Sequence, residues 1–485
     1  MTDELWTRSA LELAALVRTR EVSPVELVDV VLRRIEERNA RTNAFVTLVP
    51  ERAAAAAREA ERAVLAGESL GSLHGVPIAI KDLEATAGVR TTFGMTAFRD
   101  HVPDETAVCV ERLLGGGAGA IMVGKTNAPE LGHKSITDNA LFGPTSTPFA
   151  QGMNAGGSSG GSAAAVGDGL VPIAQGGDGG GSIRIPAALC GVYGLKPSFG
   201  RVPIAAAPNA YLAPPFVGMG PLTRTVADAA AMLDAMSGPD PRDPFALPAA
   251  ALGLADALDA PLAGLRVAYS RDLDVFDVDA DVAAVCEQAV AALAAAGATV
   301  EQVTLGLTRS QEEYRVTWQG EIAVKNANAF AAMRAAGVDL DAPENRPTPY
   351  LRAAAERGEA MRAVDYDAIG ILKSEVFHAI ERVFADHDLL VSPTCAVGGV
   401  ANPAPGSLTG PDALLDAVAN PLVGRTLAYF FNMTGHPAAS APAGLTPAGL
   451  PVGLQIVGPR WREDLVVQAS AGLERVRPWV HLYRD

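Results

Sequence analysis

Apolar residues recur at helical spacing in the first 70 residues of the chain. Ser23-Pro24-Val25-Glu26 has the form of a capping box with proline at the first helical position, which predicts a helix start. The apolar positions that follow it at helical spacing are Leu27, Val28, Val31, Leu32 and Ile35. An alanine-rich segment from about 50 to 66 predicts a further helix. We therefore expect residues 1–70 to be helical.

Short apolar runs replace this pattern after Gly75. Residues 76–80 form a run that ends in Lys81, which predicts a buried strand with a lysine at its end. Residues 120–123 form a second strand of this kind. Helical segments are expected at 107–114 and from 163 onward. Strands that alternate with helices predict an α/β fold, in which helices cover both faces of the sheet.

The second half of the chain repeats this alternation after a proline-rich segment at 237–244, which is a candidate linker. We expect strands at 265–268, 389–392 and 452–457, and an alanine-rich helix at 280–296. The stretch 305–385 is expected to be mostly helical and carries no motif, and 403–411 is predicted to be a loop. No tandem repeat is found.

Composition narrows the class of protein. The 485 residues are 49% hydrophobic and 19% charged, which is typical of a globular protein. The net charge of −16 disfavours nucleic acid and anionic membranes as partners. No run of about 20 apolar residues predicts a membrane span, and the acidic start is unlike a signal peptide. Four scattered cysteines predict neither a disulfide framework nor a metal site, and they favour a reducing, cytoplasmic location.

Two glycine-dense segments carry the candidate chemistry. Ser158 lies in the segment 156–162 and Ser182 in the segment 178–186. Glycine allows the backbone to approach a ligand closely and to adopt φ values that other residues avoid. A serine among glycines is well suited to nucleophilic catalysis, because its hydroxyl is accessible and backbone N–H groups lie beside it.

A phosphate-binding loop is one alternative. Residues 119–126 match the Walker A string, Gly119 to Gly124-Lys125-Thr126. However, the residues between the glycines have the composition of a strand, and Pro129 follows where a helix should begin. A strand that ends in a polar turn is the favoured interpretation.

A nucleophile elbow is the second alternative, because Gly156-Gly157-Ser158-Ser159-Gly160 satisfies G-x-S-x-G. An elbow needs a preceding strand, and residues 147–154 do not have the pattern of one. The histidines that could serve such an elbow are His378, His387, His436 and His481.

Several segments together resemble the amidase signature family. The two glycine segments are similar to that family's serine segments, and residues 74–82 to its lysine strand. Further similar stretches lie at 124–130, 141–145, 191–197 and 451–458. The resemblance covers most of the chain except about 300–385. It implies one large domain over 1–485, with a twisted mixed sheet covered by helices on both faces, a catalytic core at 71–240 and a variable, mostly helical substrate-covering region at 300–390.

The resemblance also assigns roles. It implies Ser182 as the nucleophile, Ser158 as a bridging serine after a cis peptide bond from Gly157, and Lys81 as the base. The oxyanion hole would come from the backbone N–H groups of residues 179–182, which include Gly179, Gly180 and Gly181. Residues expected to support the two loops are Ser159, Asp178 and Arg184. A turn role for Ser159 and a surface ion pair for Arg184 stay open.

The physical demand on Lys81 is independent of the resemblance. A lysine accepts a proton only when it is neutral, and at its reference pKa of about 10.4 well under about 1% is neutral at pH 7. Burial lowers a lysine pKa by about 3–5 units, so the end of an apolar strand is a suitable place for such a base.

Substrate contacts are less constrained by the sequence. His133 lies in a loop that lines the acyl pocket in the family, and an ordinary loop histidine is the alternative. Tyr211 and Phe216 lie in a proline-rich loop after the nucleophile. Aromatic residues on loops often line apolar pockets. Glycine at 179, where the family usually has threonine or isoleucine, would loosen the loop or open the pocket for a bulkier acyl group.

The sequence therefore predicts metal-free and cofactor-free hydrolysis of a C–N acyl bond in a small-molecule amide or carbamate. One alternative is the glutaminase-like A subunit of a tRNA-dependent amidotransferase, although such subunits usually have glutamine where Ile185 stands. A catalytically silent binding protein on the same fold is another. Homodimers are common in the family, so a homodimer is also expected.

Overall fold

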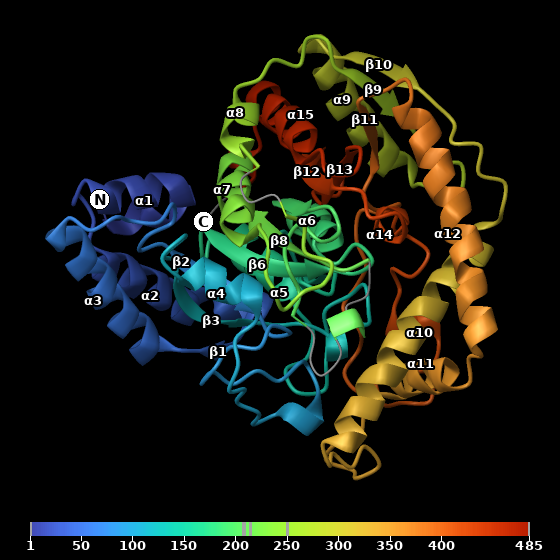
Figure 1. The fold of residues 1–485 in the computed structure, drawn as a ribbon, viewed down its shortest axis with the longest axis horizontal. Helices are drawn as coiled ribbons and strands as arrows, with labels where there is room; N and C mark the ends of the chain where they lie inside the picture. Colours follow the sequence, from blue (N-terminus) through green and yellow to red (C-terminus); the bar gives the residue numbers. More distant parts are fainter. Residues whose placement is uncertain (1, 206–209, 213–215, 249–251, 484–485) are drawn as a thin grey trace.

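An 11-stranded mixed sheet runs through the computed structural model of the chain (Figure 1). The structure describes residues 2–205, 210–212, 216–248 and 252–483. The strand order is β1-β3-β2-β6-β8-β7-β12-β13-β11-β9-β10. The strands are β1 Phe45–Leu48, β2 Pro77–Lys81, β3 Ile121–Thr126, β6 Ile173–Asp178, β7 Tyr193–Lys196, β8 Gly218–Thr223, β9 Arg266–Tyr269, β10 Thr299–Gln302, β11 Leu389–Pro393, β12 Ala438–Leu445 and β13 Pro451–Val457. A separate hairpin pairs β4 Ser146–Thr147 with β5 Ala150–Asn154.

The sheet contains two parallel groups, separated by antiparallel pairs, and its edge strand β1 pairs antiparallel with β3. β2 pairs in parallel with β3 and β6, and β9 with β10 and β11. The pairs between β6 and β11 along the sheet order are antiparallel. The expected mixed sheet with helices on both faces is therefore confirmed.

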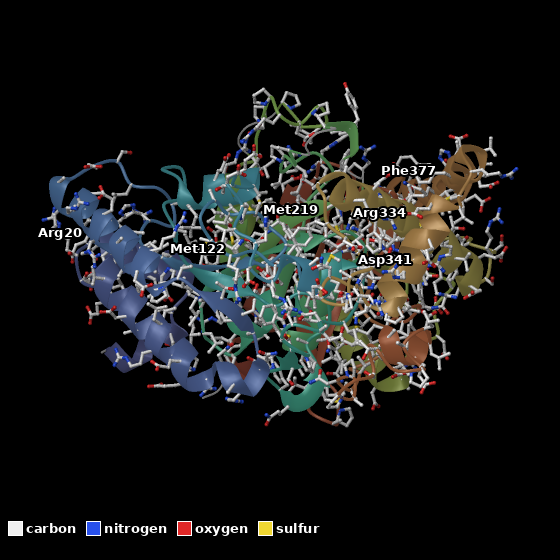
Figure 2. The ribbon with its side chains drawn as sticks, turned by 90° about the horizontal axis from the view of Figure 1, so that it is seen from below. Arg20, Met122, Met219, Arg334, Asp341 and Phe377 are labelled. Carbon is white, nitrogen blue, oxygen red and sulfur yellow. The ribbon has the colours of Figure 1, made fainter. Side chains whose placement is uncertain are left out.

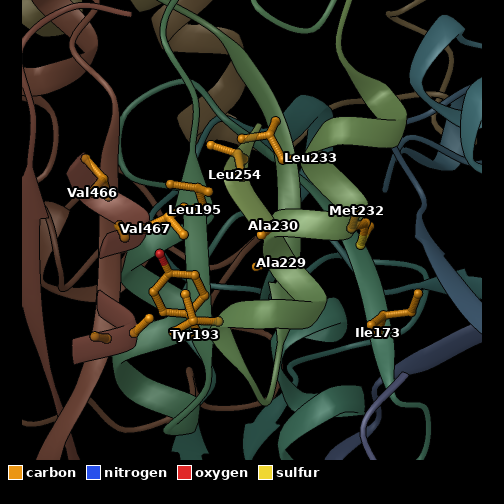
Figure 3. Close-up of a cluster of buried hydrophobic side chains, with 14 of the residues drawn as sticks. Ile173, Tyr193, Leu195, Ala229, Ala230, Met232, Leu233, Leu254, Val466 and Val467 are labelled. Atoms are coloured by element: carbon orange, nitrogen blue, oxygen red, sulfur yellow. The ribbon is translucent and has the colours of Figure 1, made fainter. Parts of the chain in front are cut away.

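Helices cover both faces because side chains alternate along each strand. On β2, Ile78 and Ile80 pack in the hydrophobic cluster that includes α1 Ala10–Arg18, α7 Val226–Met236, α9 Ala280–Ala295 and α15 Glu463–Val476. Ala79 points the other way, into the cluster of α2 Pro24–Thr42, α3 Pro50–Ala66, α5 Gly160–Gly167 and α6 Arg184–Cys190. Figure 3 shows part of the first face, where Ala229, Met232 and Leu233 of α7 lie in one cluster with Leu195 of β7 and Ile173 of β6.

The segment 305–385 is helical, as expected. It contains α10 Gln311–Ala335, α11 Pro349–Glu359 and α12 Ala363–Phe384. α10 packs against α11 and α12. In Figure 2 these helices, which carry Arg334 and Phe377, lie at the opposite end of the molecule from Arg20 and the N-terminal helices, with Met219 of β8 between them. The other α-helices of the described residues are α4 Val108–Leu114, α8 Leu254–Leu258, α13 Asp416–Ala419 and α14 Phe430–Met433.

Four local expectations need correction. Residues 1–70 are not all helical, because this region also contains the strand β1. The segment 237–244 links no separate domains, because the sheet continues past it and the Arg112 guanidinium binds the carbonyls of residues 236, 238 and 239. Ser23 caps α2 through the Val25 N–H, and its hydroxyl donates to Glu61 instead of completing a capping box with Glu26. The hairpin strand β5 lies at 150–154, where the sequence predicts no strand.

Candidate active site

Lys81 and Ser158 are in direct contact. Lys81 is the last residue of β2 and lies on the face that carries Ala79, under α5. Ser158 lies just before α5, so the fold brings the two side chains together. Lys81 Nζ is 2.7 Å from Ser158 Oγ and also donates to the Gly177 carbonyl at 3.3 Å.

The peptide bond between Gly157 and Ser158 is cis, as the resemblance implies. A side chain at Gly157 has no room, because its Cβ would lie 2.6 Å from the carbonyl carbon of Ile136. This glycine is therefore required by the close packing of the backbone at this point.

Asp178, at the end of β6, organises the loop that leads to Ser182. Its carboxylate accepts from the N–H of Gly181 at 2.7 Å and from the N–H of Ile183 at 3.2 Å. Ser182 itself is 9% exposed and opens to the same cavity as Lys81 and Ser158. Because the Gly181 N–H is already donated to Asp178, the expected oxyanion role of Gly181 is corrected: among residues 179–181, Gly179 and Gly180 line the cavity and Gly181 does not.

Arg184 forms a fully buried ion pair with Asp178, which excludes the surface pair considered from the sequence. Arg184 Nε and Nη2 lie 2.9 and 3.0 Å from the two carboxylate oxygens. Burial alone would raise the pKa of Asp178, but the charge and hydrogen bonds of Arg184 outweigh it and hold that pKa well below its ordinary value. Two further partners of the guanidinium, Asn432 and Gln455, were missed because isolated amides near the end of the chain give no sequence signal.

Ser159 joins the two glycine segments and is more than a turn residue. Its N–H donates to the Ser182 carbonyl at 3.1 Å. Its hydroxyl donates to the Gly177 carbonyl at 3.2 Å. The three residues expected to support the loops, Ser159, Asp178 and Arg184, thus all contact them.

The pKa of Lys81 lies near neutrality. It is lowered from 10.5 to about 7, mainly by burial; the carboxyl of Glu84 opposes this shift and the ammonium of Lys325 adds to it. Glu84 is itself buried, and burial raises its pKa. Lys125 donates to the Glu84 carbonyl and to Thr86 Oγ1. Sequence reasoning identified neither Glu84 nor Lys325, because neither lies in a glycine segment.

A cavity of about 340 Å³ opens over Lys81, Ser158 and Ser182. Phe216 and Trp318 form part of its wall, with their ring centroids 4.9 Å apart in an edge-to-face contact. His133 also lines this cavity. Tyr211 does not: its side chain is 73% exposed and contacts the ring of Phe245 edge-on.

The structure supports neither of the two alternative interpretations of the sequence, the phosphate-binding loop and the nucleophile elbow. Residues 121–126 form β3, and Lys125 is buried among carbonyl and hydroxyl partners, so the Walker string is a strand as expected. A strand does precede Ser158, contrary to the sequence argument against an elbow. However, none of the four histidines considered for an elbow lines the cavity at Ser158.

Comparison with known proteins agrees with this geometry. A family model described as Amidase matches residues 26–467. The chain belongs to the amidase signature family. A crystal structure described as a bacterial aryl acylamidase of this family has a TM-score of 0.92 and 37% identity, over 98% of this chain and 97% of that one.

Two curated proteins are also similar along most of the chain. An acylamidase of Rhodococcus erythropolis is 39% identical over 476 residues, which cover 97% of this chain and 96% of the relative. The A subunit of the glutamyl-tRNA(Gln) amidotransferase of Chloroflexus aggregans is 35% identical over 484 residues, with 95% and 94% covered.

Within the described residues, no group of three or more His, Cys, Asp or Glu side chains is arranged to hold a metal ion. No helix in the described ranges is both long and apolar enough to cross a membrane.

Proposed function

We propose that this chain hydrolyses amide bonds through an acyl-enzyme on Ser182, with Ser158 and Lys81 moving the proton. The observation that carries the proposal is the 2.7 Å contact between Lys81 Nζ and Ser158 Oγ at the base of the cavity that Ser182 also lines. The pKa of Lys81 near 7 keeps a large fraction of this amine neutral, and a neutral amine can accept a proton.

The proposed reaction proceeds in two halves. Lys81 takes the proton of Ser158, Ser158 takes that of Ser182, and Ser182 Oγ attacks the carbonyl carbon. The N–H groups of Gly179, Gly180 and Ser182 then donate to the developing oxyanion. The proton returns through Ser158 to the amine nitrogen, the C–N bond breaks, and the amine leaves. Water repeats the sequence on the ester and releases the acid.

The cavity wall favours an apolar substrate. Phe216, Met219, Trp318 and Ile322 give it apolar surface next to the serines. The similar proteins described as an acylamidase and an aryl acylamidase support acyl amides and anilides of small molecules as the first substrates to test. Carbamates have the same carbonyl and a C–N bond, so they belong in the same screen. A cytoplasmic location and a homodimer stay predictions, which cell fractionation and sedimentation would check.

Two parts of the chain are proposed to have different roles. The catalytic core is 71–240, and 300–390 covers the substrate. Five residues of α10 support this covering role, because they line the cavity at helical spacing: Trp318, Ile322, Lys325, Asn326 and Ala329.

Two other functions make different predictions. The A subunit of an amidotransferase would copurify with a partner chain and release ammonia from glutamine. A silent binding protein would form no covalent adduct. The acylamidase interpretation is favoured over the first of these by the higher identity, 39% against 35%.

The test is labelling with a serine-reactive fluorophosphonate, read by intact mass and peptide mapping. We expect one adduct on Ser182, none in Ser182→Ala, and labelling at least about 100-fold slower in Lys81→Ala. An adduct on Ser158 that forms equally fast without Lys81 would contradict the proposed roles. Absence of any adduct would favour the silent protein.

A further inference from the structure

α10 brings to the cavity wall a polar side chain that has no hydrogen-bond partner. Asn326 is 1% exposed and lines the cavity, yet neither its amide nitrogen nor its amide oxygen has a hydrogen-bond partner. A buried amide without partners costs roughly 1–3 kcal/mol. Such a residue in a wall that must accept a ligand therefore points to a ligand that satisfies it.

Lys325, the preceding residue, is a second unusual group. It lines the same cavity, and its Nζ donates to the Leu131 carbonyl at a long 3.5 Å. Within the described parts of the chain, no carboxylate forms an ion pair with it. Lys373 on the neighbouring helix, by contrast, pairs with Glu321 at 2.7 Å. Lys325 thus has hydrogen-bond donors left over for a group in the cavity.

His133 supplies an acceptor on the other side. Its Nδ1 is 2.7 Å from the Glu130 carbonyl, so Nδ1 carries the hydrogen in that contact. Burial lowers the pKa of His133 to about 3, which keeps the ring neutral. Its Nε2 is therefore a bare acceptor, and it has no partner. Lys325 binds the carbonyl of Leu131, two residues before His133, which places the three side chains around one part of the wall.

A small side pocket of about 80 Å³ begins at this same point. It shares His133, Asn326, Trp318 and Gly180 with the main cavity. It then continues past Tyr350 and Arg315. A substrate that fills both spaces would pass the unsatisfied polar atoms on its way from the serines.

We propose that Asn326, Lys325 and His133 form a subsite for a second amide or carbamate group of the substrate, distant from the bond that is cut. Such a group has one carbonyl and at least one N–H. The carbonyl accepts from Asn326 Nδ2 and Lys325 Nζ, and the N–H donates to Asn326 Oδ1 or His133 Nε2. This inference rests on the proposed function and adds the substrate class: diamides, dicarbamates and their oligomers.

The experiment compares matched anilides. One is the mono-anilide of succinamide, which carries a distal carbamoyl group, and the other has an isopropyl group in its place. A second pair carries the same two groups on the amine side. We expect the carbamoyl substrate of at least one pair to have a kcat/KM at least about tenfold higher. Asn326→Leu and Lys325→Met should each reduce this ratio several-fold, mainly through KM, when both substrates are compared at a pH at which Lys81 is deprotonated in each variant.

The control is Asn328→Leu, which makes the same exchange two residues away on the exposed side of α10 and should keep the ratio. If the isopropyl substrates are cut and neither pair discriminates, the subsite is wrong while the amidase function stands. If neither member of either pair is cut, the amidase function fails for these substrates. Calorimetry with Ser182→Ala then still decides the subsite, because equal Kd values for both members of each pair would overturn it.

Discussion

The N–H of Ser159 donates to the carbonyl of Ser182 across 3.1 Å, so a backbone hydrogen bond fastens the two glycine segments to each other. Ser158 directly precedes the donor residue, and Ser182 itself provides the acceptor carbonyl. Both reactive serines therefore lie within one residue of this bond. The hydroxyl of Ser159 adds a contact to Gly177, at the end of the strand that carries Asp178. The positions of the two reactive hydroxyls are therefore set together, and a change in one loop is expected to displace the other.

Activity should depend on deprotonation of Lys81. With a pKa near 7 in the free protein, kcat/KM should rise with pH through about 7, as Lys81 loses its proton, and level off above it. Lys81→Met and Lys81→Arg should both lower kcat/KM by about 10²–10⁴, since neither accepts a proton at neutral pH. A pH profile of wild type and both variants checks this. Equal activity in Lys81→Arg would contradict the role of Lys81 as base.

Glu84 and Lys325 should shift the acid limb of this pH profile, the rise of kcat/KM through about pH 7, in opposite directions. The carboxyl of Glu84 raises the pKa of Lys81, so Glu84→Gln should shift the limb to lower pH. The ammonium of Lys325 lowers that pKa, so Lys325→Met should shift the limb to higher pH. The measurement is kcat/KM against pH for both variants. Glu301→Gln, an exposed carboxyl, is the control that should leave the midpoint in place.

Asp178→Asn should destabilise the protein strongly. The substitution leaves the charge of Arg184 buried without its partner, at a cost of about 3–5 kcal/mol of unfolding free energy. Because the pKa of Asp178 is held below its ordinary value of about 3.9, this contribution is complete above that pH and is lost only in stronger acid. Urea unfolding at pH 7 measures it.

The matched control is Asp464→Asn, which breaks the exposed pair with Arg462. An exposed pair of this kind contributes at most about 1 kcal/mol. Equal losses in the two variants would show that burial of the Asp178 pair has no special effect.

Gly181 and Gly179 should differ sharply in tolerance to alanine. Gly181 has a φ of +111°, and its Cβ would lie 2.6 Å from the Cβ of Ala428. Gly179 has ordinary space, with its nearest neighbour, Val217 Cγ2, at 3.4 Å. We expect Gly181→Ala to lose at least about 100-fold in kcat/KM by displacing the loop, and Gly179→Ala to stay within about tenfold. Similar losses in both would imply that any side chain in this loop blocks the site.

The apolar patterns identified β2, β3, β9, β11 and β13, but neither the edge strands β1 and β10 nor the strands at the centre of the sheet. The strand at Lys81 and the helices at 50–66 and 280–295 follow from runs and spacing, and the structure has them. The central strands β6, β8 and β12 are rich in glycine, alanine and proline, which are depleted in most strands.

Close packing explains those central glycines. A Cβ at Gly220 of β8 would lie 2.1 Å from the Leu195 carbonyl oxygen, and a Cβ at Gly176 of β6 would lie 3.1 Å from Ser159 Oγ. The strands need glycine because other backbone and the loop carrying Ser158 approach them. Such contacts join distant parts of the chain, so local propensity cannot reveal them.

The candidate site, too, could be predicted from the sequence only in part. Lys81, Ser158, Ser182, Asp178 and Arg184 stand in segments with distinctive composition, and the structure brings them together. Tyr211 was wrongly placed in the pocket, because an aromatic residue in a loop has no fixed direction in the sequence. Asn326 stands among other polar residues of α10, and Asn432 lies in a short helix. Neither gives a distinctive sequence signal, and only the folded chain shows what they face.

The part of the cavity wall that α10 forms lies more than a hundred residues after Ser182 in the sequence. α10 and Ser182 do not belong to a common loop. A combinatorial library restricted to Trp318, Ile322, Asn326 and Ala329 would therefore change substrate preference while the serines and lysine stay intact. For a protein engineer, chemistry and selectivity in this scaffold can be varied separately.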